Sequence, residues 1–234
     1  MKIGVFTTLK ITNGTPLFFE QHRERLLSQA AKLNIGHTTI TLETIQKYLI
    51  NNSLKDCVLK LTVTVQNDAP NLILEQRPLP KNATANKVIT VEDTRNYLKI
   101  YKTTNRTIND AAKKMAEEKD ADDAIFTVNG TIIESTISNV FSVNKLGELI
   151  TPPIRAKGLN GITRQLIMQN AKVIETEINK NTKGPLVLVN SLRIQKVTHL
   201  NGKKLLDGEK LLQQILSMVD KRESEYLQKF TYHA

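Results

Sequence analysis

The stretch DAIFTVNGTIIESTISNVFSV, residues 123–143, decides which class of fold this sequence forms. Two apolar, β-branched runs flank Asn129-Gly130, a dipeptide that favours the tight turn of a β-hairpin, and a third run follows at 139–143. The segment just before them, 105–119, repeats apolar residues at spacings of three and four, as an amphipathic helix does. Strands that follow directly on such a helix predict a mixed α+β fold.

Strands and helices continue to alternate in both directions from this stretch. On the N-terminal side the patterns predict a strand at 5–11 before Asn13-Gly14, helices at 18–33 and 41–51, strands at 57–65 and 71–76, and a strand at 87–91. On the C-terminal side they predict a helix from 162 to about 171, strands at 173–178, 186–189 and 194–199, and a helix from 205 to about 226. The proline-containing stretch 77–86 marks a boundary. We therefore expect a small α/β lobe over 1–82, a connector over 83–102 and a larger lobe over 103–234.

Composition limits what the protein can be. Of its 234 residues 40% are hydrophobic and 24% charged, as in ordinary globular chains. Cys57 is the single cysteine, so no intramolecular disulfide can form, and no apolar run is long enough to span a bilayer. The first residues break into Thr and Lys before a signal-peptide core forms, so we expect a cytoplasmic protein without a membrane partner.

The formal net charge is +10, but the basic residues are spread along the whole chain. Aromatic residues make up only 5% and Trp is absent, which leaves few side chains on which nucleic-acid bases could stack. This charge favours an anionic small molecule over nucleic acid as the partner. The four histidines show no metal-binding spacing, and the sequence has no glycine-rich nucleotide loop, so we expect no metal site.

Polar residues at three places are more informative. In GLNGITR, residues 158–164, two glycines and Thr163 stand at a predicted helix start, where free N–H groups and a hydroxyl could bind a phosphate. An ordinary helix cap is the alternative. Glu134 ends a β-branched strand, where its carboxylate could hold a protonated ring nitrogen or could simply lie in a solvated turn.

Lys102 follows apolar and aromatic residues in IYKTTNR. A lysine partly withdrawn from water has a lowered pKa and can act as nucleophile and base. It could equally be a surface lysine, and Lys99, three residues earlier, is an equally available candidate.

Taken together, these segments resemble the class IV pyridoxal-phosphate enzymes, the family of branched-chain and D-amino-acid aminotransferases and aminodeoxychorismate lyase. The matching segments, in order, are FTT at 6–8, EQHRERL at 20–26, YKTTNR at 101–106, IIESTISNVFSV at 132–143, TPP at 151–153, GLNGITR at 158–164 and NSLR at 190–193. The resemblance implies pyridoxal 5′-phosphate as cofactor, a homodimer, and a two-domain fold whose larger, C-terminal lobe is a pseudo-barrel.

The resemblance also implies roles for individual residues. Lys102 would be the Schiff-base lysine, Glu134 would keep the pyridine nitrogen protonated, and Arg25 would bind the phosphate as a charge-assisted fork. Further contacts to the phosphate and the ring would come from Ile162, Thr163, Asn190, Ser191 and Leu159.

Within the family, FTT, NGITR and NSLR resemble aminodeoxychorismate lyase, which converts 4-amino-4-deoxychorismate to 4-aminobenzoate and pyruvate on the route to folate. Thr8 would then position the substrate or a proton near the leaving group. One alternative is a class IV aminotransferase acting on branched-chain or D-amino acids. A second is a non-catalytic homologue that binds little or no cofactor.

Two features depart from the family pattern. The sequence begins almost at the FTT strand, without the usual N-terminal hairpin, so we expect part of the active-site wall or dimer contact to be missing. The loop after 58–65 reads QNDAPN, where relatives often carry a substrate-binding arginine. The substrate carboxylate must then be bound elsewhere, for which Lys10 and Arg193 are candidates.

Overall fold

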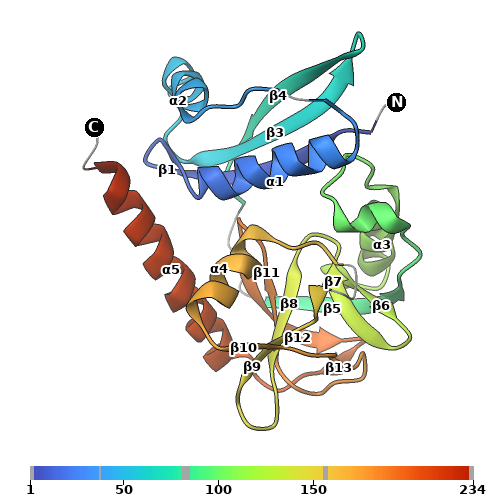
Figure 1. Cartoon of the computed structure of the whole chain (residues 1–234). Helices are drawn as coiled ribbons and strands as arrows, with labels where there is room; N and C mark the ends of the chain where they lie inside the picture. The colour runs from blue at the N-terminus through green and yellow to red at the C-terminus, as the bar shows by residue number, and fades with distance from the viewer. Residues whose placement is uncertain (1–2, 37, 81–84, 155–157, 232–234) are drawn as a thin grey trace. The chain divides into compact units, whose positions relative to one another are not determined.

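The computed structural model describes residues 3–36, 38–80, 85–154 and 158–231. It confirms the mixed α+β class (Figure 1). The chain divides into two compact units, of which the first comprises Met1–Lys81, Tyr101–Asn105 and Lys221–Ala234. The second comprises Asn82–Ile100 and Arg106–Asp220. None of the described helices is long and apolar enough to cross a membrane.

The first unit is built on a four-stranded antiparallel sheet with the strand order β2-β1-β3-β4. Its strands are β1 (Val5–Thr12), β2 (Thr15–Pro16), β3 (Cys57–Gln66) and β4 (Ala69–Arg77), and its helices are α1 (Phe19–Lys32) and α2 (Leu42–Asn51). Asn13 and Gly14 both have a positive φ, 50° and 74°, and form the turn that the sequence predicts after the first strand.

Helix α1 covers one face of this sheet and determines which side chains of β1 lie on each face (Figure 1). Val5, Leu9 and Ile11 of β1 belong to one buried cluster with Phe19, Leu26 and Ala30 of α1. Because successive strand residues point to opposite faces, Thr7 lies on the α1 face, whereas Phe6 and Thr8 lie on the other. This alternation places Thr7 on the face that packs against α1 and Thr8 on the opposite face of β1.

The second unit contains a larger, curled sheet of nine strands. Its main order is β10-β9-β8-β11-β12-β5-β6-β7, and β13 pairs with β12. The strands are β5 (Ala85–Glu92), β6 (Asp123–Val128), β7 (Thr131–Ser135), β8 (Asn139–Val143), β9 (Leu149–Thr151), β10 (Val173–Glu175), β11 (Leu186–Val189), β12 (Ile194–Leu200) and β13 (Lys203–Lys204). The helices are the short η1 (Tyr97–Ile100), α3 (Thr107–Glu117), α4 (Ile162–Asn170) and the first part of α5 (Glu209–Thr231).

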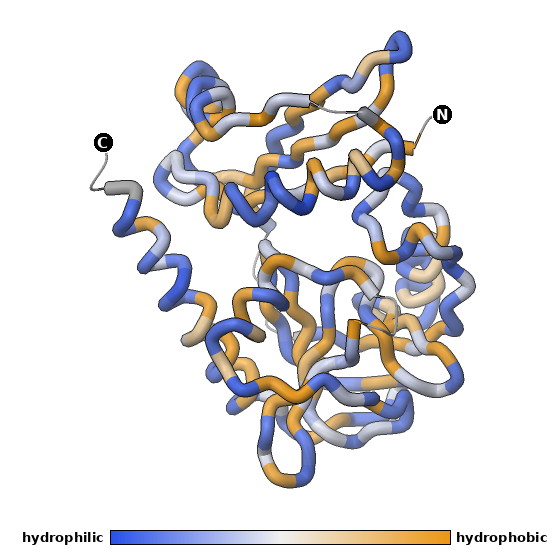
Figure 2. The backbone as a smooth tube through the Cα atoms, viewed as in Figure 1, coloured by the Kyte–Doolittle hydropathy of each residue, from blue (hydrophilic) through white to orange (hydrophobic). Residues whose placement is uncertain are grey.

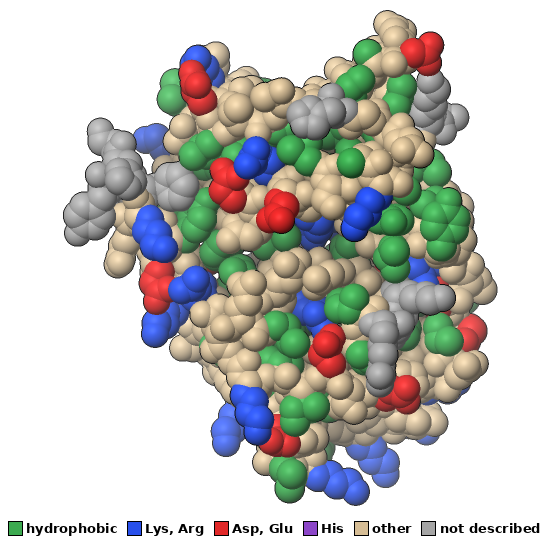
Figure 3. Space-filling view, in the orientation of Figure 1, with side chains coloured by type: hydrophobic (Ala, Val, Ile, Leu, Met, Phe, Trp, Pro, Cys, Tyr) green, Lys and Arg blue, Asp and Glu red, His purple; other side chains and the backbone are tan. Residues whose placement is uncertain are grey.

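The strands of this sheet are apolar over much of their length (Figure 2). Leu211, Leu212 and Ile215 of α5 pack in one cluster with Phe141 and Val187 from neighbouring strands. On the face shown in Figure 3, basic side chains are interspersed with acidic ones rather than gathered in one patch. The final helix begins at Glu209, later than the predicted residue 205, because Leu205 belongs to a different buried cluster and Gly208 precedes the helix.

Candidate active site

Lys102 belongs to the first unit, where backbone contacts fix it against β1 and α1. Its carbonyl accepts a hydrogen bond from the Phe6 N–H at 2.8 Å, and its own N–H donates to Gln29 Oε1 at 2.9 Å. The Lys102 Nζ lies 4.7 Å from the centre of the Phe6 ring. The lysine side chain is therefore placed on the face of β1 that carries Phe6 and Thr8.

Lys99, the other lysine that the sequence leaves open, has different surroundings. It belongs to the second unit, where its Nζ lies 2.8 Å from a carboxylate oxygen of the buried Asp93. An amine held as an ammonium by a buried carboxylate is a poor nucleophile. This ion pair argues against Lys99 as the reactive lysine.

Arg25 of α1 is a partly buried cation. Its Nη2 donates to the Thr7 hydroxyl at 2.9 Å, and burial lowers the pKa of Arg25 to about 10. Within the ranges that the structure describes, no carboxylate forms an ion pair with Arg25. A partly buried guanidinium without an opposite charge has an energetic cost, and an anionic ligand such as a phosphate would supply that charge.

His22 lies one helical turn before Arg25 and completes this cluster. Its Nδ1 is 2.6 Å from the Thr7 hydroxyl. Burial, followed by the charges of Arg25 and Lys102, holds the pKa of His22 well below its usual value, so the imidazole is neutral. Arginine can only donate, so Thr7 accepts from Arg25 and its own proton can go to a neutral imidazole nitrogen. Thr7 and His22 thus orient Arg25.

Sequence reasoning missed both orienting residues. The spacing of His22 and Arg25 in EQHRERL, three residues on one helix face, was a usable signal for His22. Thr7 could have been distinguished from Thr8 by strand alternation once helix α1 was assigned to one face of the sheet.

Thr8 lies on the opposite face of β1 from Thr7. It is buried, and among the described residues its hydroxyl has no hydrogen-bond partner. Lys60 of β3 is its direct cross-strand neighbour, and the Lys60 Nζ lies 5.4 Å from the centre of the Phe6 ring. A hydroxyl on the same face as Lys102 and not engaged by the protein can contact a substrate.

Glu134 is the central acidic group of the second unit. It lies on β7 with 5% of its surface exposed, and its Oε1 accepts from Arg95 Nη1 at 2.9 Å. Its Oε2 accepts from the Leu159 N–H, also at 2.9 Å. Burial raises the pKa of Glu134, while the charge of Arg95 acts in the opposite direction. Each carboxylate oxygen keeps a second lone pair, so Glu134 can accept one further hydrogen bond, as from a protonated ring nitrogen.

Arg95 and Asp93 extend this site, and sequence reasoning missed both. The Asp93 carboxylate accepts from the Arg95 Nε at 2.9 Å, and the Arg95 guanidinium lies 3.8 Å from the centre of the Phe126 ring. Burial alone would raise the pKa of Asp93, but hydrogen bonds from Arg95 and Lys99 outweigh it and lower that pKa. No local pattern shows that these residues face Glu134, because the contact joins positions 39 residues apart.

Leu159 is held next to Glu134 by its backbone. Its carbonyl accepts from the Asn139 Nδ2 at 2.8 Å, in addition to the bond from its N–H to Glu134. A Cβ at Gly161 would lie 2.2 Å from the Asn139 Oδ1, so this close approach requires glycine. The two glycines around Leu159 therefore allow its segment to pack tightly against β7 and β8.

Ile162 and Thr163 are buried at the start of α4. No side chain caps this helix, and its first N–H groups have no partner within the helix itself. In the described part of the chain the Thr163 hydroxyl also has no hydrogen-bond partner. This helix start can therefore accept an anionic group, as the sequence predicts for a phosphate.

Asn190 and Ser191 lie in the turn between β11 and β12. The Asn190 Oδ1 accepts the N–H groups of Leu192 and Arg193, at 2.8 and 2.9 Å, and its Nδ2 donates to the Ser138 hydroxyl at 2.9 Å. The Asn190 side chain thus shapes the turn and ties it to the loop after β7. Ser191 lies half-buried in that turn.

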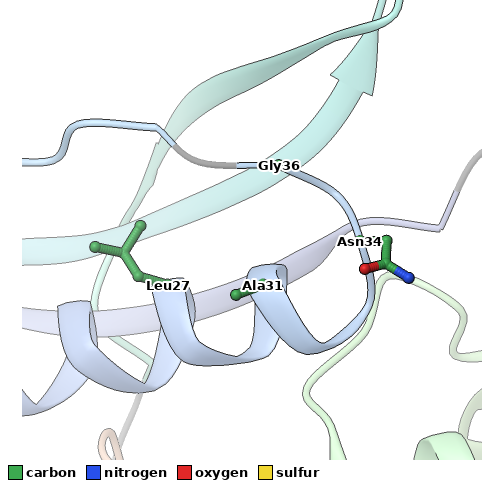
Figure 4. A pocket seen from close by; sticks show the side chains of 4 residues that line it. All are labelled: Leu27, Ala31, Asn34 and Gly36. Atoms are coloured by element: carbon green, nitrogen blue, oxygen red, sulfur yellow. The ribbon is translucent and has the colours of Figure 1, made fainter.

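Three other features of the described structure were candidates for binding a substrate, a ligand or a metal ion. Lys10, a candidate for binding the substrate carboxylate, forms an ion pair with Glu223 at 2.6 Å. A pocket of about 420 Å³ in the first unit is lined, among the described residues, by Leu27, Ala31, Asn34 and Gly36, none of which is charged (Figure 4). Among the described residues, no group of three or more His, Cys, Asp or Glu side chains could hold a metal ion.

The fold and these two polar clusters define a class of protein. The family model of class IV amino-transferases matches residues 4–197, so the chain belongs to this family, and its cofactor is pyridoxal phosphate. Among curated relatives, a D-alanine aminotransferase of Listeria monocytogenes is 28% identical over 88% of this chain and 81% of its own length. An aminodeoxychorismate lyase of Bacillus subtilis is 26% identical over 75% of this chain and 67% of its own length.

Solved structures confirm the fold. A Legionella pneumophila protein described as a 4-amino-4-deoxychorismate lyase gives a TM-score of 0.84 at 22% identity, covering 94% of this chain and 91% of that one. A hypothetical aminotransferase of Mycobacterium tuberculosis in its PLP-bound form gives 0.81 at 20% identity, covering 94% and 88%. These similarities confirm the predicted two-part fold, with a smaller N-terminal and a larger C-terminal curled sheet.

The residues present fit the cofactor. Pyridoxal phosphate carries a phosphate, which needs cations and N–H donors, and a ring nitrogen, which needs a carboxylate. Arg25 is a partly buried cation without a carboxylate partner among the described residues, and α4 begins with uncapped N–H groups. Glu134 is a buried carboxylate with acceptor capacity left.

Proposed function

We propose that this chain is a pyridoxal-phosphate-dependent aminotransferase that takes the amino group from a D-amino acid. The main support for the assigned cofactor contacts is the buried Glu134 carboxylate. It is oriented by Arg95 and by the Leu159 N–H, and it can still accept a further hydrogen bond. Support for the reaction comes from the D-alanine aminotransferases of Listeria, which match 88% of this chain, whereas the lyase of Bacillus subtilis matches 75%.

The bound cofactor supplies an electron sink for negative charge on the carbon that carries the amino group. Lys102 would hold the cofactor covalently; once the substrate amine has displaced it, the free amine of Lys102 would take and return the proton at that carbon. In this proposal Glu134 would keep the ring nitrogen protonated, and Leu159 would pack against the ring. The Lys102 Nζ lies 4.7 Å from the centre of the Phe6 ring, so the amine has an apolar neighbour.

The phosphate would be held by a different set of groups. Arg25 would provide the charge, and the neutral pair of His22 and Thr7 keeps its guanidinium oriented. The backbone of Ile162 and the hydroxyl of Thr163 would donate from the start of α4. Asn190 and Ser191 would contribute through the turn that Asn190 shapes.

Aminodeoxychorismate lyase is the second candidate function, and a specific observation favours it. The FTT triplet places Thr8 on the Phe6 face of β1 with a hydroxyl that no described residue engages. In a lyase this hydroxyl can hydrogen-bond the substrate during proton transfer to the leaving group. A lyase relative and the segments NGITR and NSLR agree with this alternative.

A turnover assay separates the two reactions. Transamination consumes a keto acid in every cycle, whereas elimination needs no acceptor. We expect the protein loaded with pyridoxal phosphate to turn over D-alanine only when 2-oxoglutarate is present, and to be inactive towards aminodeoxychorismate. Repeated formation of 4-aminobenzoate and pyruvate without an acceptor would replace the aminotransferase by the lyase. A protein that binds the cofactor and catalyses neither reaction would contradict both. The homodimer stays a prediction.

A further inference from the structure

Asp93 and Lys99 form an ion pair that neither candidate reaction uses. The Asp93 side chain is fully buried and that of Lys99 is 9% exposed, and the Lys99 Nζ lies 2.8 Å from the Asp93 Oδ2. Removing two charges from water is costly, and such pairs are weak sources of stability. Because of this cost, we infer that the Asp93–Lys99 pair has a role other than stabilising the fold.

The pair is joined directly to the candidate site through Arg95. The Arg95 Nε and Nη2 donate to the two Asp93 oxygens at 2.9 and 3.1 Å, and its backbone N–H donates to Asp93 at 3.0 Å. The remaining guanidinium nitrogen, Nη1, donates to Glu134 at 2.9 Å. A bidentate contact fixes the plane of a guanidinium, so Asp93 determines where Nη1 points.

The charges of this network balance. Asp93 and Glu134 are two anions, and Arg95 and Lys99 are two cations, all with side chains less than a tenth exposed. The charged groups that act on Glu134 are Arg95 and Asp93, both from the segment after β5, and the Leu159 N–H faces it from the segment before α4. Lys99 acts on Glu134 by neutralising Asp93.

We propose that Asp93 and Lys99 are a positioning pair that fixes Arg95 against Glu134 and sets how strongly Glu134 holds its negative charge. The inference rests on the proposed function in one respect only, namely that Glu134 keeps the ring nitrogen of the cofactor protonated. In that function Glu134 and the ring nitrogen share a proton, and the Asp93–Lys99 pair determines whether this proton stays on the cofactor. The pair itself touches neither cofactor nor substrate.

The two members of the pair have opposite effects. Without the Lys99 cation, the charge of Asp93 is no longer neutralised, so Asp93 attracts Arg95 more strongly and makes the electrostatic potential at Glu134 more negative. Glu134 then binds a proton more tightly. Without the Asp93 anion, the positive potential at Glu134 grows and the proton is bound less tightly. A charge at this range in a poorly solvated site changes a proton-binding constant by about tenfold.

The test is a pH titration of the Glu134 carboxyl by carbon-13 NMR in the full chain without cofactor, with the signal assigned by its loss in Glu134→Gln. We expect Lys99→Met to raise the proton-binding constant of Glu134 by about tenfold and Asp93→Asn to lower it by a similar factor. The double variant should return close to the original value, and Lys99→Arg should keep it. Lys87→Met, which breaks the exposed Lys87–Asp120 pair, is the matched control and should change nothing.

Shifts of the same sign in the two single variants, or no shift in either, would overturn the proposal. If both single variants fail to fold, the neutral double variant and Lys99→Arg decide, because a changed Glu134 titration in either one contradicts it. Cofactor affinity is measured separately in the unmodified chain. Failure to bind pyridoxal phosphate with the titration shifts as expected would refute the proposed function and leave the charge coupling intact.

Discussion

Replacing Arg25 by methionine should have opposite effects on the protein without and with cofactor. Without cofactor, Arg25 is a partly buried cation whose pKa is lowered by burial. The lowering of this pKa to about 10 corresponds to a destabilisation of about 3 kcal/mol at neutral pH. Methionine removes this cost but also removes the hydrogen bond from Arg25 to Thr7, which contributes about 1–2 kcal/mol.

The difference leaves the cofactor-free Arg25→Met protein about 1–2 kcal/mol more stable, which raises the melting temperature by roughly 2–8 °C. Loss of a charge-assisted contact to phosphate weakens cofactor binding by about 1.5–3 kcal/mol, or roughly 10- to 150-fold in Kd. Thermal melts at increasing pyridoxal-phosphate concentration measure both effects, because bound ligand stabilises the folded state according to its Kd.

Arg23→Met on the same helix is the matched control. Arg23 forms a surface ion pair with Glu20 and is 39% exposed, so its loss should change stability and cofactor affinity little. Unchanged pyridoxal-phosphate affinity in Arg25→Met would refute the phosphate assignment. A cofactor-free variant clearly less stable than the original chain would refute the argument that Arg25 lacks an internal counter-charge.

Further predictions concern other groups of the two clusters. Glu134→Gln should still bind pyridoxal phosphate but lose at least about 100-fold in kcat, because an amide cannot stabilise a protonated ring nitrogen; equal kcat would contradict the role of Glu134. Thr8→Val should leave D-alanine transamination nearly unchanged, and a loss of roughly 100-fold in 4-aminobenzoate formation would instead support the lyase. His22 has a lowered pKa in the folded state, so stability should fall as the pH drops below 6.5, where only the unfolded chain takes up the proton. Chemical denaturation between pH 5 and 8 should show a flatter profile for His22→Gln; identical profiles would contradict a neutral His22.

Much of the fold could be predicted because the periodicities are strong. The apolar face of the helix at 107–117 and the two asparagine-glycine turns gave elements close to those observed. Strands β9 and β13, with three and two residues, were missed because an alternation of two cannot be seen over so short a stretch. Their pairing depends on neighbours distant in the sequence.

The candidate site was only partly predictable for a related reason. Lys102, Arg25 and Glu134 stand in recognisable segments, so the sequence singles them out. Arg95 gains its role from a contact with Glu134 across 39 residues, and Thr7 gains its role from facing α1. Such roles depend on which strands become neighbours and on which face of the sheet a helix packs. A local sequence pattern determines neither.

The most direct test of the account is to locate the lysine that binds the cofactor. Borohydride makes the reversible link between pyridoxal phosphate and a lysine amine permanent, and peptide mapping by mass spectrometry then identifies the residue. We expect the label on Lys102 in the original chain, no label in Lys102→Ala, and an unchanged label on Lys102 in Lys99→Ala. A label on Lys99, or full labelling that persists in Lys102→Ala, would contradict the assignment of Lys102 and with it the candidate active site.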